Sequence, residues 1–224
     1  MSKHLERDLE QLRKQLLAVG SLVEGATNRA ITALTHRQPD LADAVFDADD
    51  EIDALEVQIE EECLKILALH QPVAADLRFV IAVMKVNNDL ERMGDQAVNI
   101  AERAVYLAGR PPLDVSLNIE RMAEVTRGMV RASLDAVVNL DADIARSVGT
   151  MDDEVDEIHR EMFRLVQDRL RRSSDVVEQA IAYLSASRDL ERIADLATNI
   201  AEDVLFTVLG EVVRHRGAPG QSPA

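Results

Sequence analysis

The residues best suited to chemistry in this 224-residue chain are carboxylates spaced four residues apart. Residues at i and i+4 share one face of a helix, where two like charges repel each other by roughly a few tenths of a kcal/mol. A bound cation would remove this repulsion, so repeated pairs on helices favour metal binding. The acid-to-aspartate pairs are Asp49 with Asp53, Glu91 with Asp95, Asp152 with Asp156, and Glu191 with Asp195.

Two of these pairs lie in copies of one motif. The stretch DLERMGDQAVNIAE at 89–102 returns as DLERIADLATNIAE at 189–202, and ten of the fourteen positions are identical. On a helical wheel of about 100° per residue, Glu91, Asp95 and Asn99 border the apolar stripe instead of opposing it. Asn99 and Asn199 are therefore possible additional oxygen ligands beside the carboxylates.

The pairs around Asp49 and Asp152 also correspond, but with substitutions. In the first half Glu56 and Glu60 extend the acidic arc, whereas His159 and Phe163 occupy the matching places in the second half. Carboxylate and amide oxygens suit Mg²⁺, Mn²⁺, Ca²⁺ or iron, and a histidine nitrogen could admit zinc.

Other interpretations remain open at this stage. An isolated acidic pair is usually a solvated helix face, and a metal-free scaffold that binds partner proteins is a serious competitor. A metal-dependent phosphoester hydrolase on a carboxylate-lined bundle is the enzyme alternative, although the sequence contains no Gly-rich phosphate loop and no Ser/His/Asp set. A ferritin-like di-iron bundle would need Glu-x-x-His motifs, which the sequence lacks.

Helices must position these residues, because apolar side chains recur at helical spacing almost throughout and no segment alternates as a strand does. The breaks fall at Arg37–Asp40, at Gln71–Pro72 and at Gly109–Pro112, where prolines end or start helices. The sequence predicts an all-α fold of six long helices. The fourth helix ends near Leu140, the fifth runs from Asp143 to about Arg172, and the sixth runs from about Asp175 to Gly210.

The correspondence between the halves indicates an internal duplication of a three-helix unit. The offset is 103 residues at Asp49 and 100 at Asp89, so the second half lacks about three residues near the Gln71–Pro72 turn. We expect a first repeat over 1–110, a second over 111–216, and a disordered Gly/Pro/Ser-rich tail over 217–224.

Composition narrows the classes of function. Hydrophobic residues make up 47% of the chain and aromatic residues only 3%, which predicts an aliphatic core. A net charge of −16 argues against binding to nucleic acid. The single Cys63 and the lack of a long apolar run predict a cytoplasmic protein without membrane insertion.

The sequence resembles the PhoU family, the accessory and regulatory proteins of bacterial phosphate-specific transport, from about Leu9 to about Leu209. The segments that carry the resemblance are DDEIDALEVQIEEECLKILALHQPVAADLR (49–78), NNDLERMGDQAVNIAE (87–102) and RDLERIADLATNIAED (188–203). The resemblance implies two three-helix bundles related by pseudo-symmetry, in agreement with the duplication.

The resemblance also implies a function. Its E(D)-x-x-x-D motifs hold multinuclear metal clusters, usually of iron or zinc, which here would fall on the four acidic pairs; Mg or Mn is also possible. It implies a non-catalytic homodimer that restrains the phosphate ABC transporter through its ATPase, PstB. It further implies restraint of the sensor histidine kinase PhoR, which keeps the phosphate-starvation (Pho) regulon off when phosphate is plentiful.

Overall fold

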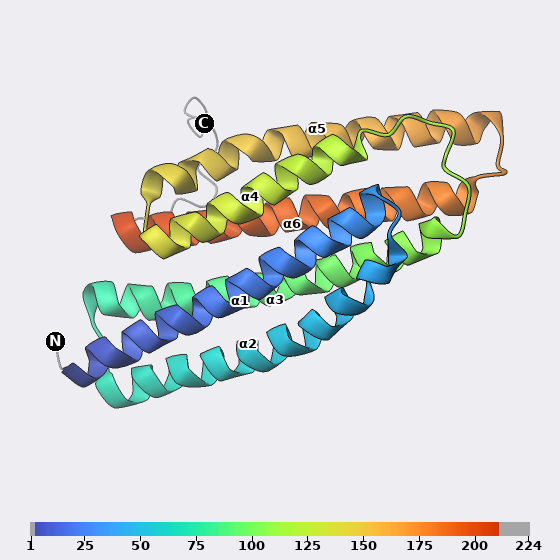
Figure 1. Cartoon of the computed structure of the whole chain (residues 1–224). Coiled ribbons are helices and arrows are strands. Elements are labelled where there is room, and N and C mark those ends of the chain that lie inside the picture. The colour runs from blue at the N-terminus through green and yellow to red at the C-terminus, as the bar shows by residue number, and fades with distance from the viewer. Residues whose placement is uncertain (1–2, 211–224) are drawn as a thin grey trace, which may run out of the picture.

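The computed structural model describes residues 3–210, and helices account for almost all of that range (Figure 1). The α-helices are α1 (Lys3–Thr35), α2 (Asp43–His70), α3 (Ala74–Ala108), α4 (Ile119–Asn139), α5 (Ala142–Arg172) and α6 (Val177–Leu209). A short 3-10 helix, η1, covers Pro39–Leu41. The all-α fold of six long helices predicted from the sequence is confirmed.

Helix ends follow from local backbone chemistry. Gln71 and Leu140 adopt left-handed conformations, with φ of 46° and 49°, and each donates its amide to the last turn of the helix it ends. The side chain of Asp141 caps α5 by accepting hydrogen bonds from the amides of Asp143 (2.8 Å) and Ile144 (3.0 Å). These turns set where α3 and α5, two of the four helices that carry acidic pairs, begin.

The first interhelical connection differs from the sequence expectation. The proline and the acidic residue at 39–40 were expected to start the second helix directly, but they form η1, and α2 begins three residues later at Asp43. The guanidinium of Arg37 links this corner to the end of α3. It donates to the carbonyl of Leu107 in the last turn of α3 and to the carbonyl of Arg110 just beyond it.

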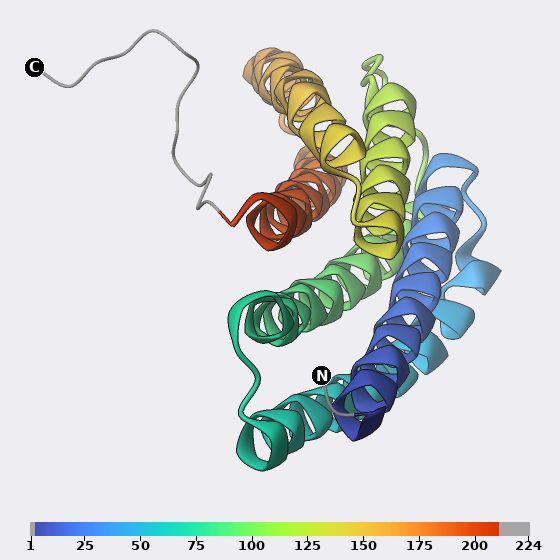
Figure 2. The same ribbon diagram turned by 90° about the vertical axis from the view of Figure 1, so that its left-hand side faces the viewer.

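The six helices form two three-helix bundles that share α3 and α6 as their common boundary. Helices α1, α2 and α3 contact one another, and so do α4, α5 and α6. Helices α3 and α6 run antiparallel along the middle and make the most extensive contact between the bundles. In the view of Figure 2, α2, α3, α6 and α5 form one layer in that order, and α1 and α4 cover one of its faces.

The core is continuous across both bundles. Its largest fully buried side chains come from α1, α2, α3, α4, α5 and α6, and they form one cluster of Leu, Ile, Val, Met and Ala. The aliphatic core predicted from the composition is therefore present. At Gly20 an added Cβ would lie 2.8 Å from Cδ2 of Leu134, so α1 and α4 cross closely because this position has no side chain.

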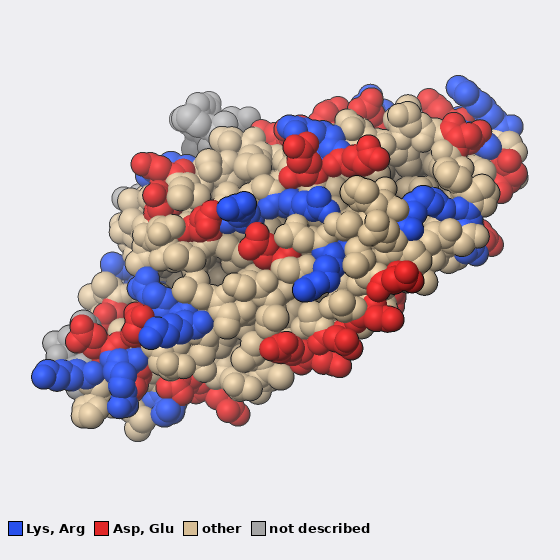
Figure 3. Space-filling model, in the orientation of Figure 1, with Lys and Arg blue, Asp and Glu red and all other residues tan. Residues whose placement is uncertain are grey.

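Charged residues of both signs are spread over the face formed by α1 and α4 (Figure 3). Within residues 3–210, none of the helices combines the length and the hydropathy needed to cross a bilayer. The expected boundary between repeats at 110–111 lies between α3 and α4 and stays a prediction. The expected tail at 217–224 lies outside the described residues.

Candidate metal-binding site

The first acidic face consists of Asp49 and Asp53 on α2 with Glu91 and Asp95 on α3. A glycine brings the two helices together here, because a Cβ on Gly94 would lie 3.2 Å from Oδ1 of Asp49 and 3.3 Å from Cδ1 of Ile52. Asp49 and Glu91 are half-buried, while Asp53 and Asp95 are exposed. The carboxylates thus border the core, as the helical wheel predicted.

The carboxylates of this face destabilise one another's charged forms. Burial raises the pKa of Asp49, and the negative charges of Asp53 and Asp95 raise it further. Burial, followed by Asp95 and Asp53, likewise raises the pKa of Glu91. Among residues 3–210, Oδ1 of Asp49 is a buried oxygen without a hydrogen-bond partner. Such an arrangement favours a proton or a cation between the helices.

Asn87 is a buried polar residue of this face that sequence reasoning missed. Its side chain is 1% exposed, and its Nδ2 donates a 2.9 Å hydrogen bond to the carbonyl oxygen of Glu56 on α2. Its Oδ1 is buried without a hydrogen-bond partner in the described part of the chain. Asn87 lies one helical turn before Glu91, so the i, i+4 spacing in NNDLERMGD was the signal that could have identified it.

The second acidic face consists of Asp152 and Asp156 on α5 with Glu191 and Asp195 on α6. Burial raises the pKa of Asp152 to about 6, and the charges of Asp195 and Asp156 contribute next. Burial and the charge of Glu191 raise the pKa of Asp195. Asp156 also lies 3.8 Å from Nη2 of Arg160, so this face has a basic neighbour that the sequence argument did not include.

His159 gives the second face a nitrogen donor. Its Nδ1 lies 3.0 Å from Oγ of Ser187, and that hydroxyl donates its only proton to the carbonyl of Leu184 at 2.9 Å. The hydroxyl therefore accepts the proton on Nδ1, which leaves Nε2 as the ring nitrogen with a free lone pair. Ser187 and His159 occupy the places that Asn87 and Glu56 hold in the first half.

The donor types of both faces fit a hard or borderline cation, but the side chains do not converge. Within residues 3–210, no three His, Cys, Asp or Glu side chains stand in an arrangement that would already hold a metal ion. The like charges of the carboxylates oppose their convergence, and a cation would have to draw them together by rotation of side chains on helices that are already in contact. Asn99 and Asn199 are half-buried one turn beyond the aspartates. The ligand set therefore stays a prediction.

The two acidic faces lie in one layer of helices. Each lies along the contact between two neighbouring helices of the layer α2, α3, α6 and α5, and α1 and α4 cover the opposite side of that layer (Figure 2).

Fold and site together define a class: an all-α protein of two homologous three-helix bundles, each with a carboxylate-lined face between two helices. Comparison with known families agrees and narrows this class. The model of the PhoU domain matches residues 16–104 and again 119–204. The chain belongs to the PhoU family.

Individual relatives resemble the chain over most of its length. A PhoU homologue from Pseudomonas putida, named as a phosphate-specific transport system accessory protein, is 39% identical over 97% of this chain and 85% of its own. A homologue of the same name from Aquifex aeolicus is 39% identical over 95% of this chain and 96% of its own. The crystal structure of PhoU from Pseudomonas aeruginosa is similar with a TM-score of 0.89 and 37% identity, over 92% of this chain and 99% of that one.

Proposed function

We propose that this protein is a non-catalytic accessory protein of phosphate-specific transport that restrains phosphate uptake and the phosphate-starvation response. The observation that carries the proposal is the similarity to relatives named as accessory proteins of that system, at 39% identity over 95% or more of this chain. The acidic faces supply the surface through which it would act.

In this proposal the residues of each face hold metal ions, iron or zinc in the first place. Bound cations would neutralise the carboxylates and present positive charge to a partner's carboxylate or phosphate group. In the first face Asp49, Glu91 and Asp95 have raised pKa values, so the charged forms that a metal needs are the ones that a bound cation would stabilise. Asp53 would complete the oxygen donors.

The proposed partners are the ATPase subunit of the phosphate transporter and the sensor kinase of the starvation response, with the protein acting as a homodimer. A net charge of −16 makes direct action on DNA unfavourable, since it would repel the phosphate backbone. Control of gene expression would therefore pass through the kinase.

Deletion of the gene tests the regulatory role. We expect phosphate-starvation genes to be expressed in rich phosphate, and we expect this expression to disappear when the partner kinase is deleted as well. Complementation with the wild-type gene should restore repression, whereas the double substitution Glu91→Lys and Asp95→Lys should not. Normal repression in the deletion strain at high phosphate would overturn the proposal.

A separate experiment tests the proposal that the protein has no catalytic activity. The purified protein, loaded with Mn²⁺ or Fe²⁺, is assayed on phosphate esters and polyphosphate beside the Glu91→Ala variant. We expect the two to be equal and indistinguishable from metal alone. Turnover that depends on Glu91 would replace the regulator by a metal-dependent phosphoester hydrolase.

A further inference from the structure

The side chain of Asn87 ends in a buried oxygen atom, Oδ1, that has no hydrogen-bond partner in the described part of the chain. The residue is 1% exposed and lies in the contact between α3 and α2, where its Nδ2 donates a 2.9 Å hydrogen bond to the carbonyl oxygen of Glu56. This bond identifies Nδ2 as the branch of the amide that faces the backbone of α2. A buried acceptor without a donor is destabilising. The position therefore lacks either a donor or a cation.

Two half-buried carboxylates lie beside this oxygen. Glu91 follows Asn87 by one turn on the same face of α3, and Glu56 is the residue whose carbonyl Asn87 bonds across the helix contact. Burial raises the pKa of Glu56, and the charges of Glu60 and Asp53 raise it further. After burial, the charges of neighbouring acids, Glu56 among them, also raise the pKa of Glu91. The carboxylates of Glu56 and Glu91 therefore act on each other across the contact.

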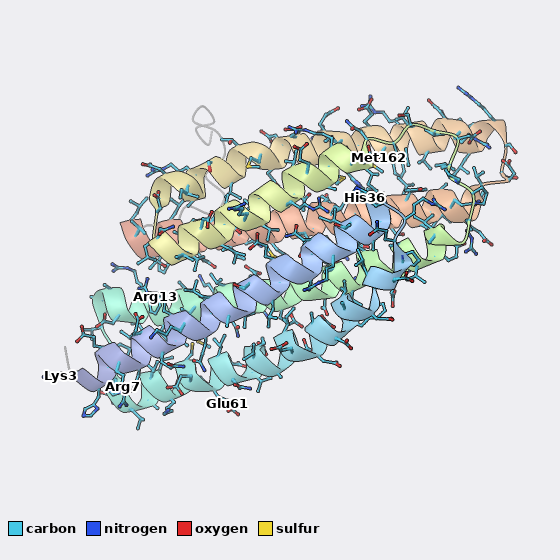
Figure 4. The ribbon with its side chains drawn as sticks, in the orientation of Figure 1. Lys3, Arg7, Arg13, His36, Glu61 and Met162 are labelled. Atoms are coloured by element: carbon cyan, nitrogen blue, oxygen red, sulfur yellow. The ribbon has the colours of Figure 1, made fainter. Side chains whose placement is uncertain are left out.

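The basic residues of α3 on either side of Asn87 pair with other acids. Lys85 lies 3.2 Å from Asp203 of α6, and Arg92 lies 3.8 Å from Asp89. Glu61 of α2 points away from α3, so the contact receives only part of the acidic residues of α2 (Figure 4). Within residues 3–210, no ion pair joins Glu56 or Glu91 to a basic side chain. The contact thus combines oxygen acceptors without a positive charge to match them.

The second face has the corresponding positions but no unpaired atom there. Ser187 replaces Asn87, and His159 replaces Glu56. The hydroxyl of Ser187 lies 3.0 Å from Nδ1 of His159 and donates to the carbonyl of Leu184 at 2.9 Å. This pair is complete without a ligand. The unpaired oxygen therefore belongs to the first face alone and is not a general consequence of the duplicated fold.

We propose that a divalent cation binds at this position, held by Oδ1 of Asn87 and by carboxylate oxygens of Glu56 and Glu91. The site lies one turn from the acidic pair of Glu91 and Asp95 and shares Glu91 with it. An amide oxygen with two carboxylates suits a hard cation such as Mn²⁺ or Mg²⁺, with water completing the coordination. The ion supplies the charge that the buried oxygen lacks and removes the repulsion between Glu56 and Glu91.

This inference rests on the proposed binding of metal by the first face and adds a position to it. The test therefore uses a background chain with Glu191→Ala and Asp195→Ala, which removes two carboxylates of the second face. Mn²⁺ is titrated into the metal-free protein, and the unbound ion is measured by electron paramagnetic resonance. We expect Asn87→Leu to lose one Mn²⁺ ion per chain, because leucine has a similar size but no oxygen.

Two further variants control for the chemistry and for the place. Asn87→Asp keeps an oxygen at the position and adds a charge, so it should retain the ion and bind it about tenfold more tightly. Asn88→Leu makes the same substitution at the exposed neighbouring residue and should bind Mn²⁺ as the background chain does. Equal loss of Mn²⁺ from Asn87→Leu and Asn88→Leu would contradict the assignment to Asn87.

Melting temperatures separate an ion site from a hydrogen bond. Without metal, Asn87→Leu should melt no lower than the background chain, since it removes a buried oxygen that has no donor. Added Mn²⁺ should raise its melting temperature less, because one ion fewer binds the folded state. A lower melting temperature without metal, together with an unchanged rise on adding Mn²⁺, would show a purely structural role and overturn the proposal.

The counts also distinguish this proposal from metal binding by the first face as a whole. Equal Mn²⁺ counts in the background chain and in Asn87→Leu would overturn the site at Asn87 and leave its oxygen to a bound water. If Glu91→Ala with Asp95→Ala still lost Mn²⁺ under those conditions, metal binding by the acidic pairs would stand. A background chain that binds no Mn²⁺ would overturn both.

Discussion

The two acidic faces occupy equivalent places in the two bundles, yet their surroundings differ. The first face combines four carboxylates with Glu56 and the buried amide of Asn87, and a glycine at position 94 lets its helices approach closely. The second face keeps the four carboxylates but replaces these residues by His159, Ser187 and Ala194. It also places Arg160 beside Asp156.

This difference separates the carboxylate pairs, which both halves retain, from the residues around them, which vary between the halves. The carboxylate pairs depend only on the i, i+4 spacing within one helix, so a duplicated sequence reproduces them wherever the helix forms. The residues around the pairs are not fixed by that spacing, and Glu56 and Asn87 of the first half are His159 and Ser187 in the second. The first face therefore has only oxygen donors, while the second adds the ring nitrogen of His159. Both faces have a basic neighbour, Arg92 for Asp95 and Arg160 for Asp156.

The largest effect expected from this comparison is on metal content. Glu91→Ala with Asp95→Ala should remove roughly half of the bound metal, and Glu191→Ala with Asp195→Ala should remove the other half, because each face supplies its own ligands. Elemental analysis of the purified variants measures this.

Chelation should lower the melting temperature without loss of helicity, since the apolar core holds the bundles without metal.

The same variants can also show whether the two faces differ in metal preference, when zinc and manganese compete for binding. The chain without the first face should bind zinc in preference, because Nε2 of His159 is a nitrogen ligand and the first face offers oxygen alone. The reciprocal variant should show a smaller preference for zinc over manganese, because its remaining ligands are oxygen atoms alone. Equal metal content in the wild type and both variants would refute the assignment of these residues, and equal zinc preference would refute only the role of His159.

The sequence predicts the helices of this fold better than the contacts between them. Apolar periodicity and the prolines placed the six helices, because each of these signals lies within a single segment. The motif around Glu91 also placed its carboxylates correctly at the edge of the core. Asn87, by contrast, contacts Glu56 across two helices, and this contact depends on how α2 and α3 are rotated about their axes. A pattern within one helix does not contain that information.

The close approach of α2 and α3 at Gly94 should affect the free energy of unfolding. Ala194→Gly should lower the free energy of unfolding by about 1–2 kcal/mol, since it removes a buried methyl group and a good helix former. Gly94→Ala should not give the reverse gain, because its Cβ would crowd Oδ1 of Asp49 and Cδ1 of Ile52, and that crowding offsets the better helix propensity. Urea denaturation of the metal-free variants measures both changes. A gain of stability in Gly94→Ala as large as the loss in Ala194→Gly would show that the two interhelical contacts are equivalent.

The smallest expected effect is the pH dependence that Asp152 of the second face adds to that of the first-face carboxyls, whose pKa values are also raised. Burial and the neighbouring acids raise the pKa of Asp152 to about 6, above its value in the unfolded chain. Between these two pKa values the folded protein binds more protons than the unfolded chain, so this group's contribution to stability is complete below the window and is lost as the pH rises through about 6. The metal-free protein should therefore melt at a lower temperature at pH 7 than at pH 5 as far as this group contributes. Asp152→Asn, which removes the charge, should reduce that difference and stabilise the metal-free protein at pH 7. A pH dependence of the melting temperature unchanged by Asp152→Asn would locate the effect elsewhere and remove this distinction between the two faces.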